Sequence, residues 1–365
     1  MRLRWAYFTV LAIALMALAV APDALAQNAG VDKVTFRDRN ADSKIVTESG
    51  EVKETPKGVE IIAGGKSKTV FANDVLKVEP GALTGVNMAE VLAVRGLEEG
   101  KDPGKAFNDY ASLVKKAGPA APERTKRYLT FREAVFATKI ADQKTGDDFN
   151  TEAVKAFDKL TVFTQLNRKS WEIWPASRTA ARIQAELGDY TKAAGVLRSL
   201  ANVADLPKEL KYEAQLAEAG MLLRAGQQTA IEGVFSPLEK DKDFSTGPLK
   251  ERLVVLRAAS KIPAPTAVGT LPPADLVAKL QDAIDQAKDP VAKAVGYSFL
   301  GEAQLAYGQT RDAMWSFLWV DVVFNQDKDE QILAVRRLIT IFDKQGDKDR
   351  EGYTTEAWAD PPGCS

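Results

Sequence analysis

The sequence of 365 residues contains no histidine and only one cysteine. Without histidine, the chain cannot form a Ser-His-Asp triad, a Cys-His dyad or a zinc site with histidine ligands. Catalysis would have to depend on carboxylates, Lys, Tyr or Ser, or on a metal held by oxygen ligands. We therefore expect a protein that is not an enzyme, with no catalytic residues, no metal site and no cofactor.

The single cysteine, Cys364, is the second-last residue, so it has no partner for a disulfide within the chain. It is either an idle thiol near a chain end or one half of a disulfide between two copies. A homo-oligomer therefore stays open as an alternative.

The chain also lacks an excess of charge of either sign. It has 49 Lys and Arg residues against 50 Asp and Glu residues, a formal net charge of -1, and no block of like charge. A balanced chain does not gather phosphate groups from solution. We expect no nucleic acid among its partners.

Residues 1–26 have the pattern of a secretory signal peptide. Arg2 and Arg4 precede an uncharged apolar run, and Ala24-Leu25-Ala26 is a small-residue cleavage site before Gln27. The alternative is an uncleaved membrane anchor, since the run comes close to spanning length. Cleavage is favoured, and it predicts a periplasmic or secreted protein that is not bound to a membrane afterwards.

Residues 27–81 predict a small β domain, because short alternating runs are separated by glycine turns. We expect a small antiparallel β-barrel or a curled sheet. The segment resembles small Sm-like or SH3-like barrels in Gly50-x-Val52-x-Glu54, in Gly58-Val59-x-Ile61 and in Val70-x3-Asp74-Val75-x2-Val78-Glu79. Such barrels often bind RNA, but residues 27–80 carry nine basic and nine acidic side chains, which is against RNA binding here.

Helical periodicity follows. Residues 87–170 predict helices without a clear repeat, whereas residues 171–346 contain a recurring Gly–x4–Ala–x3–Phe/Leu pattern. Its glycines are Gly188, Gly226, Gly308 and Gly346, separated by 38, 82 and 38 residues. Each glycine is expected to end a helix with a left-handed turn, so that the chain doubles back into a hairpin. Residues 347–365 are expected to be a cap or tail.

This pattern resembles the tetratricopeptide repeat (TPR), most closely in Leu300-Gly301, Gly308, Ala313 and Phe317. The other units are more degenerate, and the period of 38 to 41 residues is longer than the 34 of the family. The predicted fold class is mostly α: a TPR-like helical-hairpin solenoid preceded by the small β domain.

The TPR resemblance implies a concave groove that binds other protein chains. The groove positions implied by it are Arg178, Arg182, Arg224, Glu302, Arg336 and Lys344. Several guanidinium groups in one groove could hold a carboxylate or an acidic segment. The alternative is a set of solvated surface charges beside acidic neighbours such as Glu186.

Two tryptophan pairs have helical spacing, Trp171 with Trp174 and Trp315 with Trp319. They could stack on a sugar or a peptide, but packing between helices is the favoured interpretation for both pairs. From the sequence we expect an exported scaffold that binds a protein or peptide. The alternatives are a self-assembling component of the cell envelope and, less favoured, a hydrolase that works through carboxylates.

Overall fold

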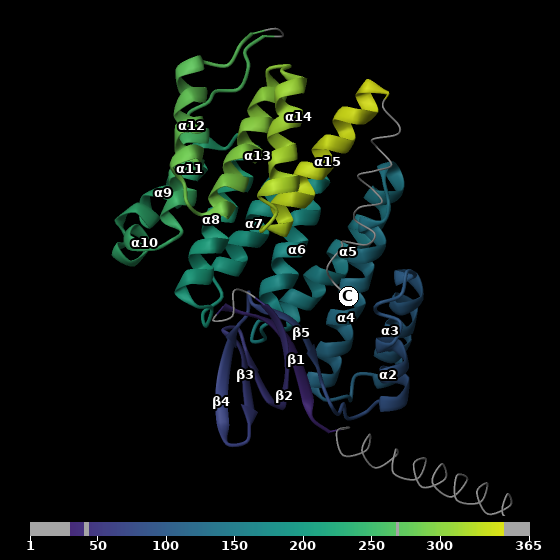
Figure 1. Cartoon of the computed structure of the whole chain (residues 1–365). Coiled ribbons are helices and arrows are strands. Elements are labelled where there is room, and N and C mark those ends of the chain that lie inside the picture. The colour runs from purple at the N-terminus through teal and green to yellow at the C-terminus, as the bar shows by residue number, and fades with distance from the viewer. Residues whose placement is uncertain (1–29, 40–43, 268–269, 347–365) are drawn as a thin grey trace, which may run out of the picture.

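The computed structural model describes residues 30–39, 44–267 and 270–346. Within them the chain forms a five-stranded antiparallel sheet followed by a long series of helices (Figure 1). The predicted fold class, mostly α with an N-terminal β domain, is confirmed. The predicted signal segment 1–26, the tail 347–365 and Cys364 lie outside the described residues.

The strands are β1 (Asp32–Asp38), β2 (Lys44–Thr55), β3 (Gly58–Ala63), β4 (Lys66–Phe71) and β5 (Val75–Glu79). Their order is β4-β3-β2-β1-β5, and β1 pairs with both β2 and β5. No pairing joins β4 to β5 among these described strands, so the sheet is open and not the closed barrel that was one of the two predicted forms. Alternate residues such as Val34, Phe36 and Ile61 are buried on one face, which is the pattern expected of an antiparallel sheet with one face covered.

The helices that follow the sheet are α2 (Met88–Arg95), α3 (Pro103–Ala117), α4 (Glu123–Asp142), α5 (Gly146–Leu166), α6 (Ile173–Glu186), α7 (Tyr190–Ala201), α8 (Lys208–Arg224), α9 (Gln228–Lys240), α10 (Lys242–Thr246) and α11 (Lys250–Ala259). They continue with α12 (Ala274–Gln286), α13 (Pro290–Ala306), α14 (Thr310–Leu318), the short π-helix η2 (Trp319–Val323) and α15 (Lys328–Gln345). From α3 to α9, each helix packs against the next one along the chain.

Three helix hairpins turn in the same way. Gly188, Gly226 and Gly308 have φ angles of 81°, 68° and 78°, in the left-handed region that glycine tolerates. After each glycine, the next amide donates to a carbonyl five residues back, as Asp189 N does to Gln184 O at 2.8 Å. The left-handed glycine turn predicted from the sequence is therefore confirmed at all three positions.

The buried side of each hairpin carries the other residues of the pattern. Ala193 and Leu197, Ile231 and Phe235, and Ala313 and Phe317 are all 2% exposed or less. Gly301 explains the Leu-Gly pair before the third turn, because a Cβ on it would lie 2.8 Å from the ring of Phe317. The recurring Gly, Ala and Phe or Leu positions are therefore explained by close packing between the two helices of each hairpin.

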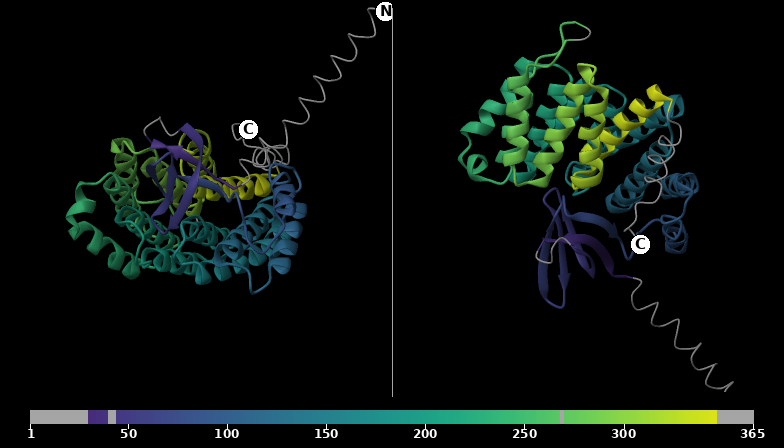
Figure 2. Two further views of the ribbon diagram at one scale, coloured as in Figure 1. Left: turned by 90° about the horizontal axis from the view of Figure 1, so that it is seen from below. Right: turned by 45° about the horizontal axis from the view of Figure 1, so that its top comes forward.

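Seen from below, the helices curve into an arc, and α15 crosses its inner side from the α13–α14 end (Figure 2). The side chain of Arg336 on α15 donates to the carbonyl of Lys144, next to the start of α5, and its guanidinium lies 4.2 Å from the ring centre of Phe149. The last helix therefore contacts an early helix across the arc.

The sheet is joined to the helices by buried ion pairs. Glu54 on β2 accepts hydrogen bonds from Arg124 and from the indole of Trp171, and it pairs with Arg127 at 2.6 Å. Arg124 also reaches Asp32 on β1 at 2.6 Å. Because several of these side chains are nearly buried, the joint is polar but shielded from water.

Glu172 lies in the same joint and shares Arg127 with Glu54, at 3.3 Å. Burial raises the pKa of Glu172 to about 7, and the charge of Glu54 acts in the same direction, against the opposing effect of Arg127. A carboxyl group with a raised pKa holds its proton in the folded state at a pH where the unfolded chain releases it.

We predict that the free energy of unfolding falls as pH rises between about 4.5 and 7, because only the native state binds the Glu172 proton in this window. The loss from pH 5 to pH 8 should be on the order of 2 kcal/mol, and Glu172→Gln should remove it. Urea unfolding of both proteins at the two pH values measures this. An equal pH dependence in wild type and variant would contradict the assignment.

Candidate functional site

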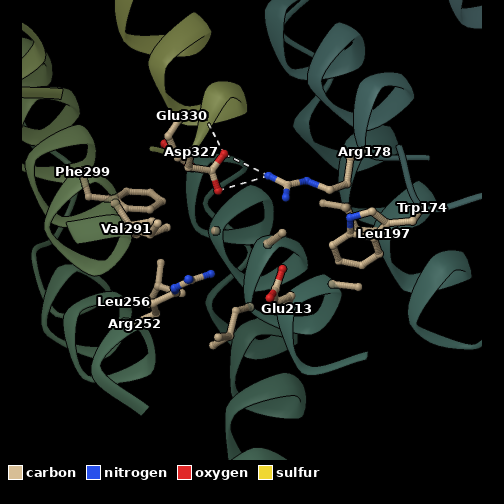
Figure 3. Close-up of a pocket in the computed structure, with 15 residues that line it drawn as sticks. Trp174, Arg178, Leu197, Glu213, Arg252, Leu256, Val291, Phe299, Asp327 and Glu330 are labelled. Atoms are coloured by element: carbon tan, nitrogen blue, oxygen red, sulfur yellow. Dashed lines mark hydrogen bonds and ion pairs between the residues drawn. The ribbon is translucent and has the colours of Figure 1, made fainter. Parts of the chain in front are cut away.

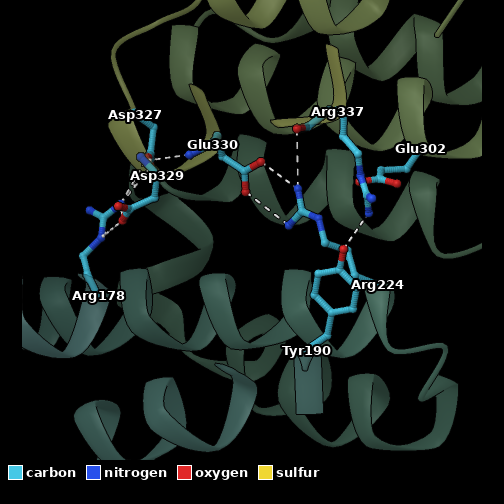
Figure 4. A network of polar contacts seen from close by, with 9 residues as sticks. Arg178, Tyr190, Arg224, Glu302, Asp327, Asp329, Glu330 and Arg337 are labelled. Atoms are coloured by element: carbon cyan, nitrogen blue, oxygen red, sulfur yellow. Dashed lines mark hydrogen bonds and ion pairs between the residues drawn. The ribbon is translucent and has the colours of Figure 1, made fainter. Parts of the chain in front are cut away.

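The six residues predicted to line a groove fall on four helices. Arg178 and Arg182 lie on α6, Arg224 on α8, and Glu302 on α13, whereas Arg336 and Lys344 lie on α15. Figure 4 shows that Arg178 and Arg224 point toward the start of α15, where a run of acidic residues begins. The expected gathering of arginines therefore exists, with α15 placed against it.

Arg178 is held by two carboxylates at the start of α15. Its Nε donates to Asp329 at 2.7 Å, and its terminal nitrogen donates to Asp327 at 2.9 Å. Burial by itself would lower the pKa of Arg178, but Asp327 and Asp329 raise it further than burial lowers it. In turn, burial favours the neutral form of Asp327, yet Arg178 and Arg252 bring its pKa below the usual value. Both groups are charged at neutral pH.

Arg224 is more deeply enclosed. Only 3% of its side chain is exposed, and it pairs with Glu330 at 2.7 Å while its guanidinium lies 4.4 Å from the ring centre of Phe299. Its Nε has no hydrogen-bond partner within the described part of the chain. A buried guanidinium of this kind depends on its one carboxylate for compensation of charge.

Arg182 and Arg336 converge from opposite sides on Glu186, whose side chain is fully buried. Arg182 pairs with Glu186 and, at 2.9 Å, with Asp142. Arg336 pairs with the other oxygen of Glu186 at 2.9 Å. Glu186 therefore connects α6 to α15 from the interior of the protein, not from a solvated surface.

Glu302 pairs with Arg337 of α15 at 2.8 Å, and Arg337 also donates to the hydroxyl of Tyr190 at 2.6 Å. Lys344, near the end of α15, is exposed to solvent. Of the six predicted residues, five are thus bound to other parts of the chain itself.

The expectation of guanidinium groups open to a partner is not met in this structure. Arg178, Arg182, Arg224 and Arg336 neutralise carboxylates of the same chain, and Arg182 and Arg224 are almost fully buried. Asp327, Asp329, Glu330 and Arg337 were not among the residues predicted from the sequence. The available signal was the acidic start of α15, which had been predicted only to begin a last helix.

The two tryptophan pairs behave differently. Trp171 and Trp174 are 2% and 4% exposed, so the prediction of core packing is confirmed for them. It is wrong for Trp315 and Trp319, which are 55% and 46% exposed. The ring of Trp319 stacks on Tyr297 with centroids 5.9 Å apart, and Val322 and Val323 beside it are also exposed. Trp315 lies on α14, whereas Trp319, Val322 and Val323 belong to the π-helix η2, so the exposed apolar side chains span the junction of these two elements.

A hollow remains between the inner helices where α15 begins. This inner cavity, of about 50 Å³, is enclosed by Trp174, Arg178, Phe299 and Asp327, with Glu213 pointing into it from α8 (Figure 3). It offers room for a few water molecules or for the tip of one side chain.

Glu213 and Arg252 also line a much larger cleft, so the inner cavity and the cleft adjoin. The cleft has a volume of about 910 Å³ and separates the end of the sheet, at Phe71 and Asn73, from the ends of the helices. On the helical side its wall comes from α8, α10 and α11 and from the segment before α13. Its remaining lining residues include Arg39, Pro207, Lys208, Glu209, Leu210, Tyr212, Asp243, Phe244, Gly247, Pro248, Leu249, Glu251, Lys288 and Asp289.

Three carboxyl groups line the inner cavity, those of Glu213, Asp327 and Glu330. Asp327 accepts hydrogen bonds from Arg178 and from the backbone amides of Asp329 and Glu330. It is therefore committed to holding the start of α15. The cavity beside it is also far smaller than a sugar ring with its attacking water would need. We do not assign a reaction to these carboxyl groups.

The described residues contain no group of three or more Cys, Asp or Glu side chains placed to hold a metal ion. None of their helices combines the length and apolar character needed to cross a membrane. Neither a protein-family model nor a curated protein sequence matches this chain.

We predict that Glu330→Ala lowers the free energy of unfolding by about 3 kcal/mol, because it leaves the buried charge of Arg224 without a partner. Replacing both residues with methionine should recover most of this loss, since an apolar pair needs no compensation of charge. Denaturant unfolding of Glu330→Ala and of the double variant Arg224→Met, Glu330→Met measures both changes.

The matched control is Asp243→Ala, which removes one carboxylate of an exposed ion pair with Lys208 and should cost less than about 1 kcal/mol. If Glu330→Ala were as mild as Asp243→Ala, the contact between α8 and α15 would not hold the inner face together.

Proposed function

We propose that this protein is an exported, non-enzymatic scaffold that binds a peptide or an extended segment of another protein. The observation that carries this proposal is the cleft of about 910 Å³ between the sheet and the helices. Binding is placed in this cleft because Arg178 and Arg224 are already bound by α15, and Arg182 and Arg336 by Glu186.

The dimensions and lining of the cleft support a peptide as the occupant. Its volume lies in the range of sites that enclose small ligands or a few residues of a chain. Phe71, which is 44% exposed, supplies apolar surface at the sheet end, and Phe244 and Leu249 line the helical end. The lining is both apolar and charged. This mixture suits a peptide, which presents polar backbone groups together with apolar and charged side chains.

The sequence supports the rest of the proposal. The signal-like segment 1–26 favours export to the periplasm or outside the cell, and the TPR resemblance of residues 171–346 favours a protein or peptide partner. The balanced charge is against nucleic acid as a partner. We propose no cofactor and no reaction.

The test begins with peptides selected from a random-sequence display library on the purified wild-type protein. We predict that Asn73→Trp, which places a bulky ring on the cleft wall, weakens binding of the selected peptides by at least about tenfold. Fluorescence anisotropy with synthetic copies of the peptides measures the affinity.

The control variant is Leu166→Trp, which adds the same ring at a site on α5 that is 75% exposed and outside the cleft. It should bind the peptides as wild type does. Failure to select any peptide, or equal binding to Asn73→Trp, would contradict the proposal.

A second candidate function is self-assembly in the cell envelope, and one observation favours it. The apolar patch of Trp315, Trp319, Val322 and Val323 is exposed on one surface, and patches of this kind often mark contacts between proteins. Under this candidate, sedimentation should show concentration-dependent dimers of wild type and monomers of Trp315→Glu, with Leu166→Glu behaving as wild type. A wild-type monomer at high protein concentration would exclude it.

A further inference from the structure

The charges around the cleft and the inner cavity are unequal. Together these two hollows are lined by seven carboxylates and five cationic side chains of the described residues. The carboxylates are Glu209, Glu213, Asp243, Glu251, Asp289, Asp327 and Glu330, and the cations are Arg39, Arg178, Lys208, Arg252 and Lys288. The surplus is acidic, although the groove arginines suggested a basic surface.

Most of the cations on the wall are already bound to carboxylates. Arg252 pairs with Asp289 at 2.7 Å, Lys208 pairs with Asp243 at 2.5 Å, and Arg39 pairs with Asp74 at 2.6 Å. The first two pairs join residues of the wall itself, whereas Asp74 lies outside the lining, and each pair offsets the charge of its cation. The remaining cation, Lys288, is exposed at the rim.

Three of the lining carboxylates, Glu209, Glu213 and Glu251, form no ion pair within the described residues. Glu251 accepts hydrogen bonds from the backbone amides of Lys288 and Asp289, at 2.6 and 2.7 Å, which leaves Glu209 and Glu213 as the two with no such contact. Glu209 and Glu213 are one helical turn apart on α8, so they face the same side of the helix, and both line the cleft. Within the described part of the chain, neither forms an ion pair at salt-bridge distance. Glu209 is exposed near the mouth of the cleft, whereas Glu213 lies deeper, where the cleft meets the inner cavity.

The surroundings of Glu213 make its charge costly in the empty protein. Burial raises its pKa, and Asp327 acts in the same direction, while Arg178 and Arg252 offset part of the effect. These two arginines are held by carboxylates of their own, so they do not bind Glu213 directly. A cation brought into the cleft would supply the missing partner.

We infer that the cleft takes a basic peptide segment, with one cationic side chain directed at Glu213 and a second at Glu209. This inference rests on the proposed function and specifies the chemistry of the partner. The inner cavity accommodates the tip of a lysine or arginine side chain, and the aromatic and aliphatic cleft wall packs against its methylene stem.

The experiment uses the purified protein and three fluorescent peptides of equal length, in which alanine alternates with lysine, glutamine or glutamate. We expect the lysine peptide to bind at least about tenfold more tightly than the glutamine peptide, and the glutamate peptide to bind most weakly. The double variant Glu209→Gln, Glu213→Gln should lose this preference for lysine and should show a weaker dependence of affinity on salt.

The matched control is the double variant Asp158→Asn, Asp282→Asn, which removes two exposed carboxylates from α5 and α12, outside the cleft. It has the same net charge as the test variant and should keep the preference for lysine. A loss of preference in this control would assign the effect to overall charge and overturn the inference.

The outcomes separate this inference from the proposed function. If all three peptides bind equally well and Asn73→Trp weakens them equally, the cleft binds peptides but the preference for basic segments is wrong. If the glutamate peptide binds best, the inference is overturned in favour of acidic partners. If no peptide binds, and none is selected from the random library, the proposed function itself fails.

Discussion

The ion pairs between α15 and the inner helices are the interaction on which the rest of the structure depends. Arg178 and Arg224 bind the acidic start of α15, and Glu186 binds Arg336 farther along it. These contacts link residues about 100 to 150 positions apart in the sequence, so they fix the curvature of the helical arc. A solenoid held only by neighbouring pairs would lack this constraint.

The same contacts determine which part of the inner side stays open. Because α15 occupies the inner face, the large cleft lies at its edge, between the helices and the end of the sheet. The position of the sheet therefore sets the width of the cleft. The buried ion pair of Glu54 and Arg127 holds the sheet in that position. Polar contacts hold both boundaries of the cleft, so the packing of α15 and the docking of the sheet act together on one site.

Local features of the sequence predicted most of the fold. The turns at Gly188, Gly226 and Gly308 and the buried positions around Phe317 follow from interactions within one helix pair, which short-range patterns record. The partners of Arg178 and Arg224 do not, because Asp329 and Glu330 are more than 100 residues away. Exposure of Trp315 and Trp319 was also missed, since helical spacing alone does not show which face of a helix the rest of the chain leaves uncovered.

The central claim is that α15 is an integral part of the inner face, and hydrogen exchange followed by mass spectrometry tests it most directly. The account predicts that amides in the middle of α15, around Leu338, exchange as slowly as those in the middle of α8, around Ala219. Both residues are fully buried, and both helices should open together. Rapid exchange throughout α15, with α6 and α8 still protected, would contradict the account, because Arg178 and Arg224 would then lose the carboxylates that hold them.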